Sequence, residues 1–523
     1  MKSEIYRKLG HAGDWCVQLQ TATSVVGCTA QDHEPLLEGL LLWPAENIED
    51  IKDLTLKDGE EYAAVVHAMD AGKFLEKHIG NVTSMPDDYT SISAILILAS
   101  QNPLGSFRWN FADKGPLSRM NDSYEYHEWN PYGLGLLKAT FNFPIVQLSQ
   151  AETELVSNGA KLNVLQQIKS NSPLYRIDIN YVMEGKDNSF VCIRDRTCLP
   201  LGGLSVLSSP VSSGRLGTSS SPVVLVTARM DSNGPFHRLL RGFNDPRSGL
   251  VAMLVAARVV GQLTINLLSR SESLEKRIIF AAIQGDAFDL MGSKRLLIEL
   301  NRDKDLQDWL DVHSDQPLEA IDAIINVGPI ARAVQHGDQR QIYAHRNPNE
   351  RSQGKVSGSI LDMMSESCGS VSSRTSLSLN RLQLLSPTEH SFAQAMVDLP
   401  IISISEYSEE FLDHGSLSQF GDYRTDGMMS EEFNIDVIAD FATVLAQALL
   451  QISFPSAKDI EINETQMTSD TRILVDCLMQ EEKNCTADQM MPIGGPFEGL
   501  EQSYVGILRS FITDRTSATV CHP

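Results

Sequence analysis

At 523 residues the chain exceeds what one hydrophobic core usually supports, so we expect two domains, or one large domain with a substantial partner lobe. Apolar residues make up 42% of the chain, which is enough to pack such cores. A formal net charge of −24 excludes roles that depend on chain-wide attraction to nucleic acid or to an anionic membrane surface. A basic or neutral partner is compatible with that charge.

Six of the eight cysteines lie close together in the sequence as three local pairs. This spacing suits short disulfide-closed loops in an oxidising compartment, and it leaves scattered buried thiols open as the alternative. Asn-X-Ser/Thr sequons also favour a secretory route, although chance alone gives a similar number in such a sequence. The pairs are Cys16 with Cys28, Cys192 with Cys198 and Cys477 with Cys485, and the sequons begin at Asn81, Asn121, Asn463 and Asn484.

The chain shows no targeting or membrane-spanning segment. Residues 1–10 lack the apolar core of a signal peptide, and no apolar run is long enough and unbroken enough to cross a membrane. The longest runs, 249–268 and 437–454, are interrupted by polar residues and predict buried helices. If the protein is secretory, we therefore expect a mature or excised soluble portion.

Two regions with different patterns follow each other along the chain. Between residues 6 and 181, short apolar runs at 94–98 and 144–148 predict strands of a mixed α/β lobe. Residues 202–222 are rich in Ser, Gly and Pro and predict a linker or long surface loop.

The second region has a regular strand, helix, strand pattern that is typical of a mostly parallel sheet. Its Ser-rich stretch at 351–380 predicts an insertion with a short helix near 360–364. The predicted strands are 223–226, 277–283, 320–327 and 399–405, and the predicted helices are 248–268, 288–301 and 431–452.

Polar positions at the strand ends follow the plan of zinc aminopeptidases that use two metal ions. That plan needs about five His, Asp or Glu ligands and a further carboxylate as general base. The first segment, 224–231, ends where the pattern has His-x-Asp, and Arg229 occupies the His position. Arginine has no accessible lone pair and stays cationic, so it cannot ligate zinc.

Two further segments keep one ligand position and lose another. Residues 242–249 resemble the loop Gly-Ala-Asn-Asp-x-x-Ser-Gly and place Asp245 at the metal-bridging aspartate. In residues 284–293, Asp286 takes the position of the general base, while Ala287 takes a ligand position with no donor atom.

The last two ligand positions fall on Ile325 and His414. Asn326 replaces Ile325 at the first of them if the register slips by one residue. Only Asp245 and His414 then remain of five ligands, and two do not hold a pair of zinc ions. We therefore predict a pseudo-aminopeptidase with no catalytic residue, no metal and no other cofactor.

Several segments together resemble the nicastrin family, whose members are ectodomain subunits of the γ-secretase intramembrane protease. The resemblance implies an α/β fold with a large aminopeptidase-like lobe, its mostly parallel sheet flanked by helices, and a smaller α/β lobe carrying a lid. The segments are Ile5-Tyr6 with Cys16 and Cys28, Trp129-Asn130, Gly133-Leu134-Gly135, Phe143-Pro144-Ile145, residues 228–232 and residues 285–289.

On this basis we expect a small lobe with its lid at 1–201, the linker or surface loop at 202–222, the large lobe at 223–455 and a C-terminal extension of the large lobe at 456–523. The family continues into a transmembrane helix that these residues do not contain. The resemblance thus implies the lumenal or extracellular portion of a single-pass type I membrane protein.

The resemblance also implies partners and a role. The partners are presenilin, as the catalytic subunit, and the two other membrane subunits of γ-secretase. The role is to gate or recognise type I membrane-protein substrates with short ectodomains. Steric exclusion of this kind needs bulk and rigidity rather than reactive residues.

Four residues acquire candidate roles from the resemblance. The family signature Asp-Tyr-Ile-Gly-Ser falls on residues 289–293, where leucine and methionine replace its second and third residues. Asp286 and Asp289 become candidate substrate contacts, although a carboxylate at a helix N-terminus is an equal alternative for Asp286. Trp129 and Phe236 become candidate lid contacts, with ordinary core packing as the alternative.

Two functions of other classes stay open at this point. One is an active zinc aminopeptidase or glutaminyl cyclase, against which Arg229 and Ala287 speak. The other is a receptor ectodomain of the transferrin-receptor kind, which a stable dimer in solution favours.

Overall fold

The computed structural model describes 23 segments of the chain. They are residues 6–9, 14–16, 36–44, 61–79, 92–99, 109–115, 127–136, 141, 143–170, 175–180, 188–195, 204–211, 221–232, 236, 244–287, 290–310, 317–351, 353–370, 375–386, 390–412, 433–456, 460–479 and 517–521.

The N-terminal part of the chain forms a seven-stranded sheet in the order β1-β7-β3-β4-β5-β6-β2. The four strands from β3 to β6 run parallel, and helices α3 and α5 flank the sheet. The strands are β1 Tyr6–Leu9, β2 Asp14–Trp15, β3 Leu36–Pro44, β4 Tyr62–His67, β5 Ile92–Leu98, β6 Ile145–Gln147 and β7 Arg176–Asn180, and the helices are α3 Ala68–Ile79 and α5 Gln150–Ser170.

Both faces of this sheet are buried, which explains why its strands are continuous apolar runs. In β4, Ala63 and Val65 join the core cluster under α5, while Ala64 and Val66 join the cluster on the opposite face. Alternate side chains of a strand point to opposite faces, so one apolar run supplies two cores.

The C-terminal part of the chain forms a nine-stranded sheet, in the order β12-β13-β15-β11-β9-β10-β8-β16 with β14 paired to β13. Its centre, β15-β11-β9-β10, is parallel. The strands are β8 Ser205–Ser209, β9 Val223–Arg229, β10 Arg277–Ile283, β11 Ile321–Val327, β12 Val334–His336, β13 Gln339–Arg346, β14 Leu377–Leu382, β15 Ile401–Ser405 and β16 Ser517–Cys521.

Helices cover both faces of the second sheet. One core cluster joins a first face to α7, α10, α12 and α13, and another joins the second face to α8, α9 and α11. A separate short helix, α6, spans Ser189–Arg194. The other bounds are α7 Arg247–Ser269, α8 Met291–Arg302, α9 Lys304–Leu310, η4 Pro317–Ala320, α10 Lys355–Ser370, α11 His390–Ala395, α12 Ile435–Ser453 and α13 Glu464–Met479.

Two helices, α7 and α12, are long and apolar enough to cross a membrane by length and composition, and in the fold they are 72% and 78% buried. They contact each other over the centre of the sheet, in agreement with the prediction of buried helices. The start of α7 lies so close to the end of β11 that a Cβ on Gly249 would stand 2.2 Å from the carbonyl oxygen of Gly328.

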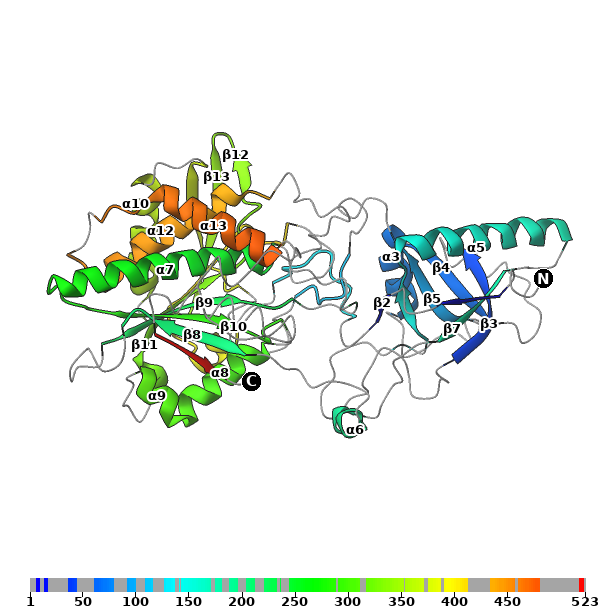
Figure 1. Cartoon of the computed structure of the whole chain (residues 1–523), viewed down its shortest axis with the longest axis horizontal. Helices are drawn as coiled ribbons and strands as arrows, with labels where there is room; N and C mark the ends of the chain where they lie inside the picture. Colours follow the sequence, from blue (N-terminus) through cyan, green and yellow to red (C-terminus); the bar gives the residue numbers. More distant parts are fainter. Residues whose placement is uncertain are drawn as a thin grey trace.

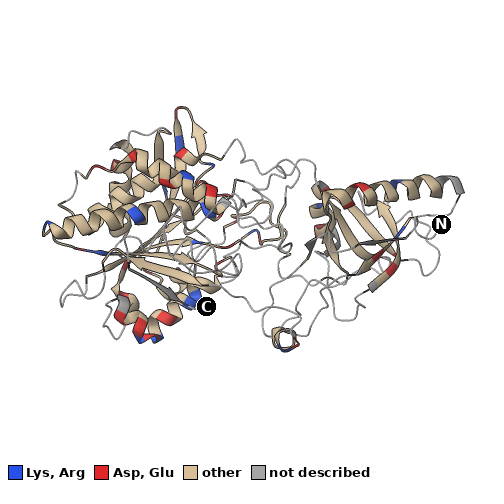
Figure 2. Cartoon of the chain, in the orientation of Figure 1, with Lys and Arg blue, Asp and Glu red and all other residues tan. Residues whose placement is uncertain are grey.

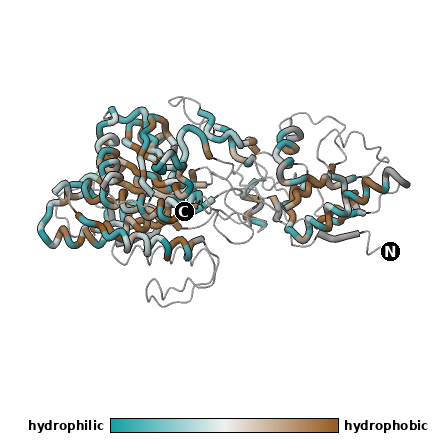
Figure 3. Tube along the Cα trace, turned by 90° about the horizontal axis from the view of Figure 1, so that it is seen from above, coloured by the Kyte–Doolittle hydropathy of each residue, from teal (hydrophilic) through white to brown (hydrophobic). Residues whose placement is uncertain are grey.

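Figure 1 shows the two sheets with their helices as two bodies side by side. In Figure 2 the strands at the centre of both sheets are mostly uncharged, and the charged residues lie mainly on helices, loops and outer strands. The hydropathy colouring of Figure 3 places the apolar stretches inside each body. The predicted α/β class, with parallel-rich sheets flanked by helices, is confirmed.

Some sequence-based expectations need correction. Residues 205–209 of the expected linker form β8, because Val206 and Leu207 alternate between the two core clusters of the second sheet. The Ser-rich stretch at 351–380 contains the 16-residue helix α10 and most of β14. Its apolar residues Ile360, Leu361 and Met364 pack into the core, and this packing outweighs the weak helix propensity of serine. The domain limits given above stay predictions.

Candidate functional site

A buried cluster of charges lies at the carboxyl end of the central strands, where loops of a parallel sheet converge. β9 ends at Arg229, and its neighbour β10 ends opposite it at Ile283. The Nη2 atom of Arg229 lies 2.6 Å from Oδ1 of Asp245, which precedes α7. The Nε atom of Arg229 donates to the main-chain carbonyl of Asp231 at 2.9 Å. The guanidinium therefore stands against the carboxylate that the aminopeptidase plan assigns to a metal bridge.

The third acidic residue, Asp286, is joined to the same cluster through Asp231. The main-chain N–H groups of Asp286 and Ala287 donate to Oδ1 and Oδ2 of Asp231 at 3.2 and 3.1 Å. Oδ1 of Asp286 in turn accepts from the N–H of Ser293, in the first turn of α8, at 2.7 Å. Asp286 therefore satisfies an N–H group that the helix leaves without an internal acceptor.

Burial and charge act against each other in this cluster. Desolvation raises the pKa of Asp231 to about 6, although the neighbouring Arg229 lowers it. Desolvation also raises the pKa of Asp286, against hydrogen bonds from Ser293 and the charge of Arg229. Burial lowers the pKa of Arg229, but Asp245, Asp231 and Asp286 together raise it above its ordinary value. The guanidinium thus stays cationic and partly neutralises a mainly acidic cluster.

Glu406 is a further buried carboxylate, hydrogen-bonded to the neighbour of Asp245 in the chain, and sequence reasoning missed it. It follows β15 and is fully buried. Its Oε1 accepts from Nδ2 of Asn244 at 2.7 Å, and its Oε2 accepts from the N–H of Arg332 at 2.8 Å. The available signal was a carboxylate directly after the buried strand β15. Residues that follow parallel strands lie at the same end of the sheet, which is the end where Arg229 lies.

The remaining predicted metal positions do not join Arg229 and Asp245 in the described residues. Ile325 lies in the core cluster under α7, and Asn326 donates to the hydroxyl of Thr227 at 3.2 Å. Ala287 contributes only its N–H. His414 and Asp289 fall outside the described residues. Across the described segments, no group of three His, Cys, Asp or Glu side chains is placed to hold a metal ion.

Trp129 crosses from the first body to the second. Its fully buried ring packs against Phe411 with centroids 6.3 Å apart, and against Tyr407 at 5.9 Å. The N–H of Phe411 donates to the carbonyl of Trp129 at 2.8 Å, which fixes the backbone as well. His345 lies 5.3 Å from the same ring, and burial lowers its pKa to about 4, so it is neutral at pH 7.

Phe236 crosses in the opposite direction. It follows β9 in the chain, yet it is buried in the core cluster of the first sheet with Trp109 and Phe111. Its ring meets that of Phe111 edge to face at 6.1 Å. The structure therefore places Trp129 and Phe236, both expected at the lid, in two separate clusters.

The secretory signals lie partly outside the described residues. Cys16 and Cys477 are disulfide-bonded, whereas Cys368 is free. The pairings with Cys28 and Cys485, and the Cys192 and Cys198 pair, involve residues whose side chains are not described. Of the sequons, Asn463 is exposed and accepts from the N–H of Gln466 at the start of α13, while Asn81, Asn121 and Asn484 are not described.

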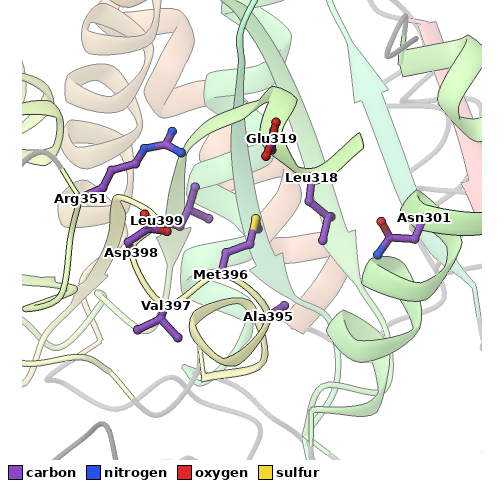
Figure 4. Close-up of a pocket in the computed structure, with 9 residues that line it drawn as sticks. All are labelled: Asn301, Leu318, Glu319, Arg351, Ala395, Met396, Val397, Asp398 and Leu399. Carbon is purple, nitrogen blue, oxygen red and sulfur yellow. The ribbon is translucent and has the colours of Figure 1, made fainter. Parts of the chain in front are cut away.

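An open recess of about 480 Å³ lies at the amino ends of β11 and β15, whereas the charge cluster lies at the carboxyl ends of the central strands (Figure 4). It contains none of the predicted site residues, so the charge cluster is not part of it. Its lining residues are Asn301, Leu318, Glu319, Arg351, Ala395, Met396, Val397, Asp398 and Leu399.

Comparisons with known proteins converge on one family. The family model described as the nicastrin large lobe matches residues 222–450, and that of the nicastrin small lobe matches residues 15–185. A nicastrin of Arabidopsis thaliana is 27% identical over 63% of this chain and 46% of its own length. A nicastrin of Dictyostelium discoideum is 26% identical over 40% of this chain and 32% of its own length. The matched part therefore spans less than half of either relative.

A solved structure shares the fold along nearly the whole chain. The crystal structure of the γ-secretase component nicastrin superposes with a TM-score of 0.68 at 16% identity. The superposition covers 98% of this chain and 92% of that one.

Proposed function

The chain belongs to the nicastrin family, and on that premise we propose that it is the ectodomain of a non-catalytic subunit of γ-secretase. In this role it gates or recognises type I membrane-protein substrates with short ectodomains. Its partners are presenilin and the two other membrane subunits, and it faces the lumen or the extracellular space. The disulfide-bonded Cys16 and Cys477 support an oxidising compartment.

The observation that carries the non-catalytic part is the Arg229–Asp245 ion pair. A guanidinium 2.6 Å from Asp245 occupies the charge-compensating position that a metal ion takes in the aminopeptidase plan. It cannot polarise a carbonyl as a Lewis acid or lower the pKa of a bound water as zinc does. Ala287 removes a further ligand, so the residues present do not fit a pair of zinc ions.

Gating by exclusion needs a bulky body held in a fixed arrangement. The two crossings, Trp129 into the second body and Phe236 into the first, supply aromatic anchors that are almost fully buried. Such anchors support a lid that stays closed, so that a large substrate ectodomain meets a rigid obstacle above the membrane. No residue of this arrangement has to react.

Asp286 is the candidate contact for the amino terminus of a substrate, with Asp289 close to it in sequence. Asp286→Asn tests this role, because an amide oxygen still accepts from Ser293 while the charge is lost. We expect weaker co-precipitation of a short-ectodomain substrate with a free amino terminus and no change for its N-acetylated form. Equal binding of both substrates by both proteins would exclude the contact and leave only the helix-capping role.

The central test is recovery of the full-length protein from membranes with an affinity tag. We expect presenilin and the two other membrane subunits to co-purify in stable proportion, and recovery without presenilin would refute the proposal. Zinc content and turnover of an aminoacyl anilide, measured on the same preparation, address the enzyme alternative. Stoichiometric zinc with turnover would support an aminopeptidase, and conversion of an amino-terminal glutamine would support a cyclase.

A further inference from the structure

Helix α5 packs against the first sheet with one face and exposes the other. Its inner face holds the first sheet: Val156 and Ala160 are buried in the cluster with Leu42, and the buried Asn163 donates to the carbonyls of Leu42 and Tyr175. These contacts account for the position of the helix. They do not involve its outer face.

The outer face of α5 carries an apolar row at regular spacing. Leu155, Leu162 and Leu165 are 48%, 39% and 51% exposed, although each is a large aliphatic side chain. Together with the exposed Ala151 and Asn158 they recur at alternating intervals of four and three residues. This is the spacing of a two-helix seam, in which apolar residues of one helix interlock with those of another. The row is roughly 20 Å long at the rise of an α-helix.

The described parts of the molecule leave the three leucines of this row substantially exposed. Figure 1 shows α5 along the top of the first body, while the second body lies to the left, beyond α3. Single exposed leucines are ordinary, but three on one helix face, interrupted only by Asn158, mark a contact surface.

The row is flanked by charges of opposite sign. Glu154 and Lys161 are both exposed on α5, one helical turn inside either end of the row. Among the described residues, neither forms an ion pair. Within one helix they are seven residues apart and thus lie two turns from each other.

We propose that the outer face of α5 binds the same face of a second copy of this chain, with the two helices antiparallel. A two-fold axis between residues 157 and 158 then brings Glu154 of each copy beside Lys161 of the other. It also brings Leu155 close to Leu162 across the axis. In a parallel pair the two copies of Glu154, and the two of Lys161, would lie on opposite flanks of the seam, so neither charge would meet its opposite.

The contact is small, and this sets its strength. One helix pair buries less than the roughly 1,200 Å² at the lower end of stable interfaces. We therefore expect a dissociation constant on the order of 100 µM in solution. The proposal is independent of membership in a membrane complex, so either can fail without the other.

The experiment is sedimentation velocity of the intact chain from 5 to about 500 µM. We expect reversible dimerisation for the natural sequence and at least tenfold weaker association for Leu155→Glu/Leu162→Glu. The matched control is Ile298→Glu/Ile473→Glu, which places the same charges on α8 and α13 at similarly exposed positions and leaves the dimer unchanged. Circular dichroism verifies that each variant is folded.

Charge reversal tests the orientation separately. Glu154→Lys and Lys161→Glu each place like charges at both flanking contacts, so each variant should dimerise about fivefold more weakly. The double variant, or an equimolar mixture of the two single variants, restores opposite charges and should recover the natural affinity. A monomer at every concentration, loss of the dimer in the control, or failure of the mixture to recover would overturn the proposal.

Discussion

Replacing Arg229 by methionine tests the charge cluster directly. Methionine fills most of the same space without the charge, so the change isolates the electrostatic contribution. Arg229 and Asp245 are both more than nine-tenths buried, and Asp231 and Asp286 lie within the same enclosure. Removal of one partner of a buried pair leaves an uncompensated charge and costs about 3–5 kcal/mol. We expect a loss of that size in the free energy of unfolding at pH 7.5.

The loss should shrink as the pH falls. Without the cation, the pKa values of the folded carboxylates rise further, so the folded state takes up protons that the unfolded state does not. Its relative stability is then regained as the pH falls towards 5. Urea unfolding followed by circular dichroism at both pH values measures this difference.

Two further variants make the result specific. Arg229→Met/Asp245→Asn removes the uncompensated charge and should recover at least half of the loss. Arg194→Met, which breaks the exposed Arg194–Asp195 pair at the end of α6, should leave the free energy of unfolding almost unchanged. A loss below 1 kcal/mol for Arg229→Met, or one that does not depend on pH, would refute the argument that this cation holds the cluster together.

Three other changes have defined outcomes. The pKa of Asp231 in the folded state is about 6, against an ordinary 3.8. The protonated carboxyl therefore stabilises the folded state by about 3 kcal/mol below pH 3.8, and this stabilisation is lost as the pH rises through 6. Asp231→Asn should therefore gain stability relative to the natural protein between pH 4 and 7, and a constant difference in urea unfolding would contradict this. Trp129→Ala should lose about 3–5 kcal/mol and speed hydrogen exchange at residues 407–412, whereas Phe190→Ala on the exposed side of α6 should do neither. Gly249→Ala should cost at least about 2 kcal/mol in the same unfolding assay, because its Cβ would overlap the carbonyls of Val327 and Gly328; an unchanged midpoint would show that the backbone yields there.

The fold class and the charged end of β9 could be predicted because both are local in the sequence. Apolar runs of strand length indicate buried parallel strands. A motif that follows such a strand lies at the carboxyl end of the sheet, because parallel strands all end on that side. The structure places Arg229 against Asp245 at the carboxyl end of the central strands. Glu406 escaped because a single glutamate after a strand carries no motif.

Other features depend on residues far apart in the chain and could not be read from it. Trp129 was singled out, but its partners Tyr407 and Phe411 lie more than 270 residues away. The helix α10 owes its length to packing against α12, which a Ser-rich composition does not reveal. Ile325 was assigned to a ligand position, whereas the alternation of β11 directs it into the core under α7.

The opposed crossings of Trp129 and Phe236 also restrict rotation between the two bodies. A single buried anchor would leave each body free to turn about it, as a ball joint does. Two anchors at separate places remove that freedom. Trp129 belongs to the first body and packs in the second, and Phe236 belongs to the second body and packs in the first. A cut between the bodies would expose an aromatic ring on one piece and an empty receiving cluster on the other. Neither half is then a natural unit for expression, and the intact pair should unfold in a single cooperative transition.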